Sequence, residues 1–136
     1  MKIYVFGNVD DQSDSIAIST IKKIEPEFPT IDFEFIKPNQ DLPFNDNENI
    51  VIVDAVEGPN KIKYFEDADL NKVILLKSST AHDYDLGFQL KYLKKLGKLG
   101  KVSIVAIPKD KTLDQEDLVS IHSIFKKLVA QDIQGS

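Results

Sequence analysis

The feature that most constrains the fold is the apolar run at residues 50–53, which the charged residue Asp54 ends. Four consecutive β-branched residues are typical of a strand buried on both faces, as in the centre of a parallel sheet. We therefore expect a parallel strand over residues 49–55, with Asp54 at its carboxyl end. Because open α/β proteins bind ligands at that end of their strands, Asp54 is predicted to lie at a functional edge.

Further strands are expected on both sides of this run. Residues 2–6 predict a buried strand, and residues 31–36 alternate between apolar and polar side chains, which indicates a half-exposed strand near a sheet edge. Residues 102–107 predict a last buried strand, which Pro108 ends. Residues 62–65 and 73–76 are candidate short strands.

Apolar residues at helical spacing follow three of these strands. Ser13 or Asp14 is expected to cap the first helix, which ends near Pro26 and Pro29. The second helix is predicted to begin at Asp83 or Asp85 and to end at Gly97 or Gly100, and the third to begin at Asp114. This alternation predicts an α/β fold of the three-layer α/β/α sandwich type, phosphorylase/hydrolase-like, around a mostly parallel twisted sheet.

Composition narrows the class of protein. A chain of 136 residues predicts a single domain over residues 1–136. The absence of cysteine excludes disulfides, thiolate zinc sites and a cysteine nucleophile. The net charge of −5 argues against a nucleic-acid surface. No apolar run is long enough for a signal peptide or a membrane span, so we expect a cytoplasmic protein without a membrane partner.

Three separated residues are candidates for one site: Asp14 at a helix start, Asp54 at a strand end and His82 in a loop. Asp14 and His82 each have a simpler explanation alone, because Asp14 is placed as a helix cap and a lone loop histidine is usually solvated. Asp54 is harder to explain by structure alone, because an unpaired buried charge is expensive. At one rim of a sheet, however, two carboxylates and an imidazole suit a divalent ion such as nickel, zinc or manganese. The other histidine, His122, falls within the last helix and is interpreted as structural or solvated.

Four stretches resemble, in order and spacing, those of the nickel-iron hydrogenase maturation endopeptidases. Together they extend over nearly the whole chain, and each alone is a weak motif. The stretches are the strand that runs into Gly7-Asn8 and reaches Asp14, residues 50–55, residues 79–82 followed by Leu86 and Leu90, and residues 103–108.

The resemblance implies an enzyme that removes the C-terminal extension of a [NiFe]-hydrogenase large subunit precursor after nickel insertion. It implies a sheet of about five strands, and it assigns the family's metal-binding positions to Asp14, Asp54 and His82. These residues would recognise nickel already seated in the precursor, with no organic cofactor. The catalytic residues and the oligomeric state stay open.

The chain departs from the family pattern in two loops. Residues 13–17 lack the first acid and both glycines of the family's opening loop, and residues 37–41 hold no glycine where the family has a Gly-Thr-Ala-Gly-like turn. Because Pro38 in that turn cannot donate a backbone hydrogen bond to an extended peptide, a second hypothesis is a non-proteolytic module that binds a metal or a metalloprotein. A third, a flavodoxin-like or nucleotide-binding domain, is disfavoured because the acidic loop at residues 10–14 would repel phosphate and no Walker or G-x-G-x-x-G pattern occurs.

Overall fold

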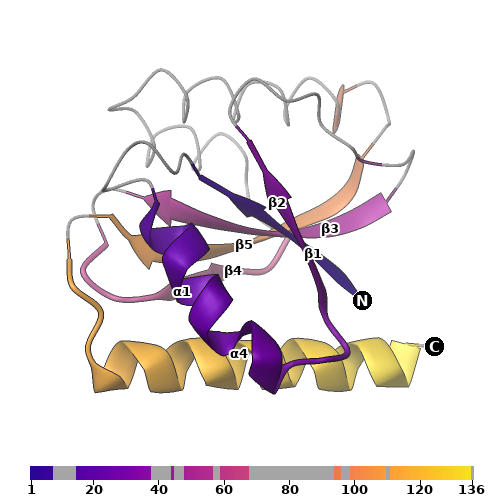
Figure 1. The fold of residues 1–136 in the computed structure, drawn as a ribbon. Helices are drawn as coiled ribbons and strands as arrows, with labels where there is room; N and C mark the ends of the chain where they lie inside the picture. The colour runs from indigo at the N-terminus through magenta and orange to yellow at the C-terminus, as the bar shows by residue number, and fades with distance from the viewer. Residues whose placement is uncertain are drawn as a thin grey trace.

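The computed structural model shows an α/β fold in the part of the chain it describes (Figure 1). The described residues are 1–7, 15–37, 44, 48–56, 59–67, 94–95, 99–109 and 111–135. The strands are β1 (Lys2–Phe6), β2 (Asp32–Ile36), β3 (Glu48–Val56), β4 (Lys63–Phe65) and β5 (Leu99–Pro108). The helices are α1 (Ile16–Ile24), the short 3-10 helix η1 (Glu25–Glu27) and α4 (Gln115–Gly135).

The strands form one five-stranded sheet in the order β2-β1-β3-β5-β4. The pairs β1–β2, β1–β3 and β3–β5 are parallel, and only β4 runs antiparallel, against β5. The predicted α/β class and mostly parallel sheet are therefore confirmed, with the strand of residues 31–36 at an edge and that of residues 49–55 in the centre. The candidate strand at residues 73–76 and most of the predicted second helix lie outside the described residues.

One predicted boundary is wrong. The N-cap of α1 is Ser15, whose backbone carbonyl accepts the first helical bond from Ser19 at 3.0 Å, rather than Ser13 or Asp14. Of the two predicted ends of the second helix, Gly97 lies outside the described residues, and Gly100 is excluded because strand β5 begins at Leu99. The cause is sheet pairing, because Leu99 is in register with Glu48 of β3 and the ladder extends past the apolar run.

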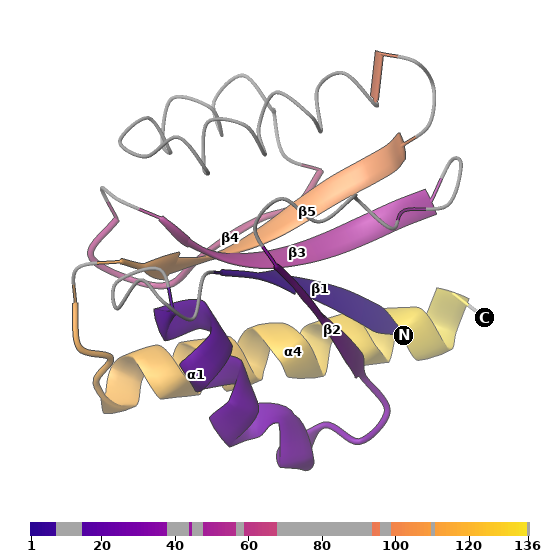
Figure 2. The same ribbon diagram turned by 45° about the horizontal axis from the view of Figure 1, so that its top comes forward.

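One face of the sheet is covered by both α1 and α4 (Figures 1 and 2). Side chains of β1, β3 and β5 meet the apolar stripes of the two helices there, and Phe125 of α4 lies at the centre with no exposed surface. Its ring packs against Phe28 and Phe33, each at 5.6 Å between ring centroids. No helix in the described ranges is both long enough and apolar enough to cross a membrane.

The opposite face carries a second apolar cluster. Its buried members are Tyr4, Phe6, Ile36, Ile50, Ile52, Leu99, Val102 and Ile104. Because side chains alternate between the faces of a strand, Asp54 shares the face of Ile50 and Ile52, away from α1 and α4. The central strand therefore presents its carboxylate on the face opposite the two described helices.

Candidate functional site at the carboxyl edge of the sheet

Asp54 is a buried acid near the carboxyl end of the central strand. It is 3% exposed and lies in register with Ala106 of β5, two residues before β3 ends. The backbone N–H of Ala55 donates a hydrogen bond of 2.8 Å to Oδ1 of Asp54. The expected placement of Asp54 near the carboxyl end is confirmed, although β3 continues to Val56.

Burial of the Asp54 carboxylate among apolar side chains costs free energy. Its neighbours on the same face of the sheet include Ile52 and Ile104, both almost fully buried. Taking a carboxylate out of water costs several kcal/mol unless charge partners or hydrogen bonds compensate, and the Ala55 N–H supplies one such bond. The Asp54 carboxylate is therefore a candidate ligand rather than a side chain that serves core packing.

The other two members of the predicted trio, Asp14 and His82, lie outside the described residues. Within the described ranges, no three histidine or acidic side chains are grouped so as to hold a metal ion. Of the set Asp14, Asp54 and His82, only Asp54 is therefore placed, and the convergence of the three stays a prediction.

Lys109 is a second buried charge at this edge, and sequence reasoning missed it. It follows directly on β5, is 5% exposed, and its backbone N–H donates a 2.9 Å hydrogen bond to the carbonyl of Val56. Lysine is among the residues least often buried, so the residue type alone does not indicate this burial. The signal available in the sequence was its position one residue after Pro108, at the end of a buried strand.

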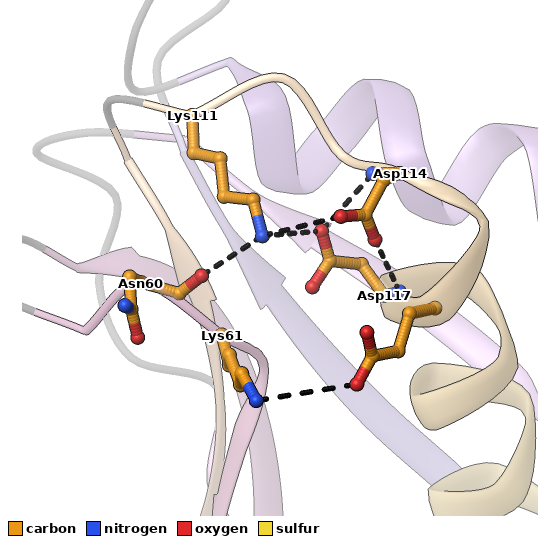
Figure 3. A network of polar contacts seen from close by, with 6 residues as sticks. Asn60, Lys61, Lys111, Asp114 and Asp117 are labelled. Carbon is orange, nitrogen blue, oxygen red and sulfur yellow. Dashed lines mark hydrogen bonds and ion pairs between the residues drawn. The ribbon is translucent and has the colours of Figure 1, made fainter.

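A polar network beside the edge joins the start of α4 to the chain between β3 and β4 (Figure 3). The ammonium of Lys111 lies 3.0 Å from Oδ2 of Asp117 and 3.6 Å from Oδ2 of Asp114, and donates a 2.9 Å hydrogen bond to the carbonyl of Asn60. Asp114 and Asp117 also form a reciprocal cap, because each carboxylate accepts the backbone N–H of the other at 2.9 and 3.0 Å. This pairing is a capping box with aspartate in place of glutamate.

The contacts of the network set the charge states of its members. Burial disfavours the charged form of Asp117, but the Asp114 N–H and the Lys111 ammonium outweigh it and lower the pKa of Asp117. The same contacts, led by the hydrogen bond to Asp117, raise the pKa of Lys111. Both groups are thus ionised at neutral pH, and the network acts as a structural brace.

His122 makes structural contacts, as expected from its place in the last helix. Its Nδ1 lies 2.8 Å from the backbone carbonyl of Leu118, and its Nε2 faces the carboxylate of Glu27 in η1. Because both ring nitrogens face acceptors, the doubly protonated ring satisfies both contacts. The Leu118 carbonyl and then Glu27 accordingly raise the pKa of His122.

The fold is similar to those of solved peptidase structures. HybD, a hydrogenase maturating endopeptidase from Escherichia coli, has a TM-score of 0.65 at 16% identity, over 100% of this chain and 94% of that chain. An endopeptidase from Escherichia coli has a TM-score of 0.62 at 16% identity, covering 96% and 91%. The hydrogenase 2 maturation peptidase of Thaumarchaeota archaeon SCGC_AB-539-E09 has a TM-score of 0.51 at 18% identity, covering 98% of each chain.

The described residues form an α/β fold with a buried acid near the carboxyl end of the central strand. The HycI family model, described as hydrogenase maturation protease, matches residues 35–132. The chain therefore belongs to the hydrogenase maturation protease family and is a hydrolase. The match includes Asp54 and His82 but begins after Asp14. No curated protein sequence matches the chain.

Proposed function

We propose that this protein is an endopeptidase that removes the C-terminal extension of a [NiFe]-hydrogenase large subunit precursor. In this proposal, Asp14, Asp54 and His82 recognise the nickel already inserted in the precursor. The chain acts as one domain over residues 1–136, in the cytoplasm. The observation that carries the proposal is the buried carboxylate of Asp54 at the carboxyl edge of the central strand, inside the matched region of a protease family.

The donor chemistry of Asp54 fits nickel recognition. A carboxylate oxygen together with an imidazole forms a mixed oxygen–nitrogen set that suits a divalent first-row metal. The hydrogen bond from the Ala55 N–H engages Oδ1, which fixes the orientation of the carboxylate group. The position near the end of a parallel strand is also where a partner protein can reach the site.

The reaction is the addition of water across one peptide bond. The water oxygen bonds to the carbonyl carbon, the C–N bond breaks, and the leaving amine takes up a proton. Since the chain has no cysteine, the nucleophile that fits it best is water rather than a thiolate. A carboxylate at the edge is a suitable acceptor for the proton that the water loses, and a precursor-bound metal would polarise that water.

A second candidate function is a module that binds a metal or metalloprotein without cutting it. The favouring observation is the segment after β2, where residues 37–41 carry a proline and no glycine. A docking peptide that adds to a strand edge needs backbone donors, and Pro38 offers none. This candidate predicts partner binding without release of a peptide.

Incubation with a nickel-loaded large subunit precursor tests the proposal, with precursor mass followed by mass spectrometry. An active family member serves as positive control. We expect a loss of mass equal to the C-terminal extension. An unchanged mass beside a working control excludes the protease function, and retained binding of the precursor then favours the second candidate.

Substitution of Asp54 tests whether its carboxylate is needed for processing of the precursor, as distinct from a general effect of removing one negative charge. Asp54→Asn removes the negative charge and keeps the shape of the side chain. Asp32→Asn is the matched control, because Asp32 lies exposed at the amino end of β2, where it has a 3.9 Å ion pair with Lys2. We expect processing to be lost in the first variant and kept in the second.

A further inference from the structure

Strand β2 has one open side among the described strands (Figures 1 and 2). It stands first in the sheet order and pairs there only with β1. The backbone N–H of Asp32 donates a 2.7 Å hydrogen bond to the carbonyl of Met1, so the backbone groups of Asp32 face β1. Because successive residues of a strand direct these groups to opposite sides, those of Glu34 also face β1, whereas those of Phe33 and Phe35 point outward.

The side chains of β2 give its two faces different character. Phe35 lies on the face that carries α1 and α4, where the ammonium of Lys22 is 5.8 Å from the centroid of its ring. Glu34 lies on the opposite face, with 37% of its side chain exposed. Lys2 is 4.0 Å from Glu34 and also 3.9 Å from Asp32. Since one lysine is shared by two carboxylates, the Glu34 face keeps an excess of negative charge at the open side of β2.

A second copy of the chain fits this open side poorly. Two β2 strands related by a two-fold axis would pair antiparallel. In the register that uses the outward groups of Phe33 and Phe35 of both copies, the two Glu34 carboxylates would lie opposite each other. Like charges that are directly opposite destabilise a pair of strands, whereas opposite charges stabilise it. Glu34 therefore disfavours self-association through this edge and favours a strand that carries a basic residue.

We propose that the outer side of β2 binds an extended segment of a partner protein, added antiparallel as a further strand, with a lysine or arginine opposite Glu34. The N–H and C=O groups of Phe33 and Phe35 bond the backbone of the segment and give affinity, while Glu34 selects the basic residue. Pro38 follows the end of β2 and removes none of these donors. This inference does not depend on the protease function proposed above.

Nuclear magnetic resonance of the full chain with the peptide acetyl-Val-Thr-Val-Lys-Val-Thr-Val-amide tests the proposal. As a strand, this peptide places lysine and threonine on one face and valine on the other. We expect the amides of Phe33 and Phe35 to shift and to become protected from hydrogen exchange as the peptide is added. The same peptide with glutamate in place of lysine should bind about fivefold more weakly. N-methylation of the valines beside the lysine should abolish binding, because their N–H groups donate to the carbonyls of Phe33 and Phe35.

Substitution of Glu34 tests the selection from the side of the protein. Glu34→Gln should lose most of the preference for the lysine peptide over the glutamate peptide, because no carboxylate then faces the central residue. Glu25→Gln is the matched control, since it makes the same change at an exposed residue outside the sheet, and it should keep the preference. Circular dichroism checks the fold of both variants, and the comparison of peptides on the wild type needs neither of them.

Three results would overturn the proposal. The first is a lysine peptide that leaves the amides of Phe33 and Phe35 unchanged, and the second is equal binding of the lysine and glutamate peptides by the wild type. The third is protection of those amides when the concentration of the chain alone is raised, which would identify a second copy as the occupant. An uncut precursor with the wild-type protein would instead contradict the protease function and would leave peptide binding unchanged.

Discussion

The backbone N–H of Lys109 donates a 2.9 Å hydrogen bond to the carbonyl of Val56, where β5 and β3 end together. This bond closes the parallel ladder at the carboxyl edge and brings the end of β5 beside the strand that carries Asp54. Asp54 and Lys109 are both almost fully buried. The carboxyl edge of the sheet thus carries one buried charge of each sign, Asp54 and Lys109.

The cap of α4 should contribute measurably to stability. Asp114→Ala removes the side chain that accepts the Asp117 N–H, and loss of such a cap costs about 1 kcal/mol. Urea denaturation should show this decrease in the free energy of unfolding. Asp132→Ala is the control, because Asp132 is an exposed residue near the far end of the helix, with a 4.0 Å ion pair to the N-terminus. Equal effects in the two variants would contradict the capping role.

The core beneath the sheet should be sensitive at Phe125. This ring has no exposed surface and contacts Phe28 and Phe33. Phe125→Ala leaves a cavity and should cost about 3–5 kcal/mol of unfolding free energy. Val119 on the same helix is 59% exposed, so Val119→Ala should change stability by less than about 0.5 kcal/mol. A loss at Phe125 no larger than that at Val119 would contradict the packing described for α4.

The contact between His122 and Glu27 predicts a dependence of stability on pH near neutrality. The folded-state pKa of His122 is raised above its ordinary value of 6.5. Its contribution is therefore fully present below pH 6.5 and is lost as the pH rises through the folded-state pKa. The contribution should be below about 1 kcal/mol, because Glu27 is exposed.

Nuclear magnetic resonance titration of the His122 ring measures this shift directly. We expect a midpoint above 6.5 in the wild type and a lower midpoint in Glu27→Gln, which removes the negative charge of one of the two acceptors. Glu25→Gln, at the start of the same 3-10 helix, should leave the midpoint unchanged. A wild-type midpoint at or below 6.5 would contradict the arrangement of the ring between two acceptors.

The lowered pKa of Asp117 predicts a second pH dependence of stability, at acid pH. Its pKa is lowered from the ordinary 3.8, so its contribution is complete above that value and is lost as the pH falls through the lower folded-state pKa. Unfolding free energies of the wild type and Asp117→Asn should therefore differ at pH 5, and the difference should shrink as the pH falls below 3.8. A difference that grows on acidification would contradict the ionised pair with Lys111.

Much of the sheet could be predicted because its strands are short runs of β-branched residues. Residues 50–53 could form little else than a central strand, and Asp54 then had to lie near its end. The start of β5 could not be predicted, because Leu99 and Gly100 are strand residues only through pairing with β3. The burial of Lys109 was missed as well, since it depends on where the end of β5 lies in the fold rather than on lysine's own preference.

Processing of a nickel-loaded large subunit precursor by the wild type and by Asp54→Asn tests the central claim most directly. The account predicts that the wild type shortens the precursor by its C-terminal extension, that Asp32→Asn does so equally, and that Asp54→Asn leaves the mass unchanged. Equal shortening by Asp54→Asn would contradict the role given to the buried carboxylate. No shortening by the wild type, beside an active family member, would contradict the protease function itself.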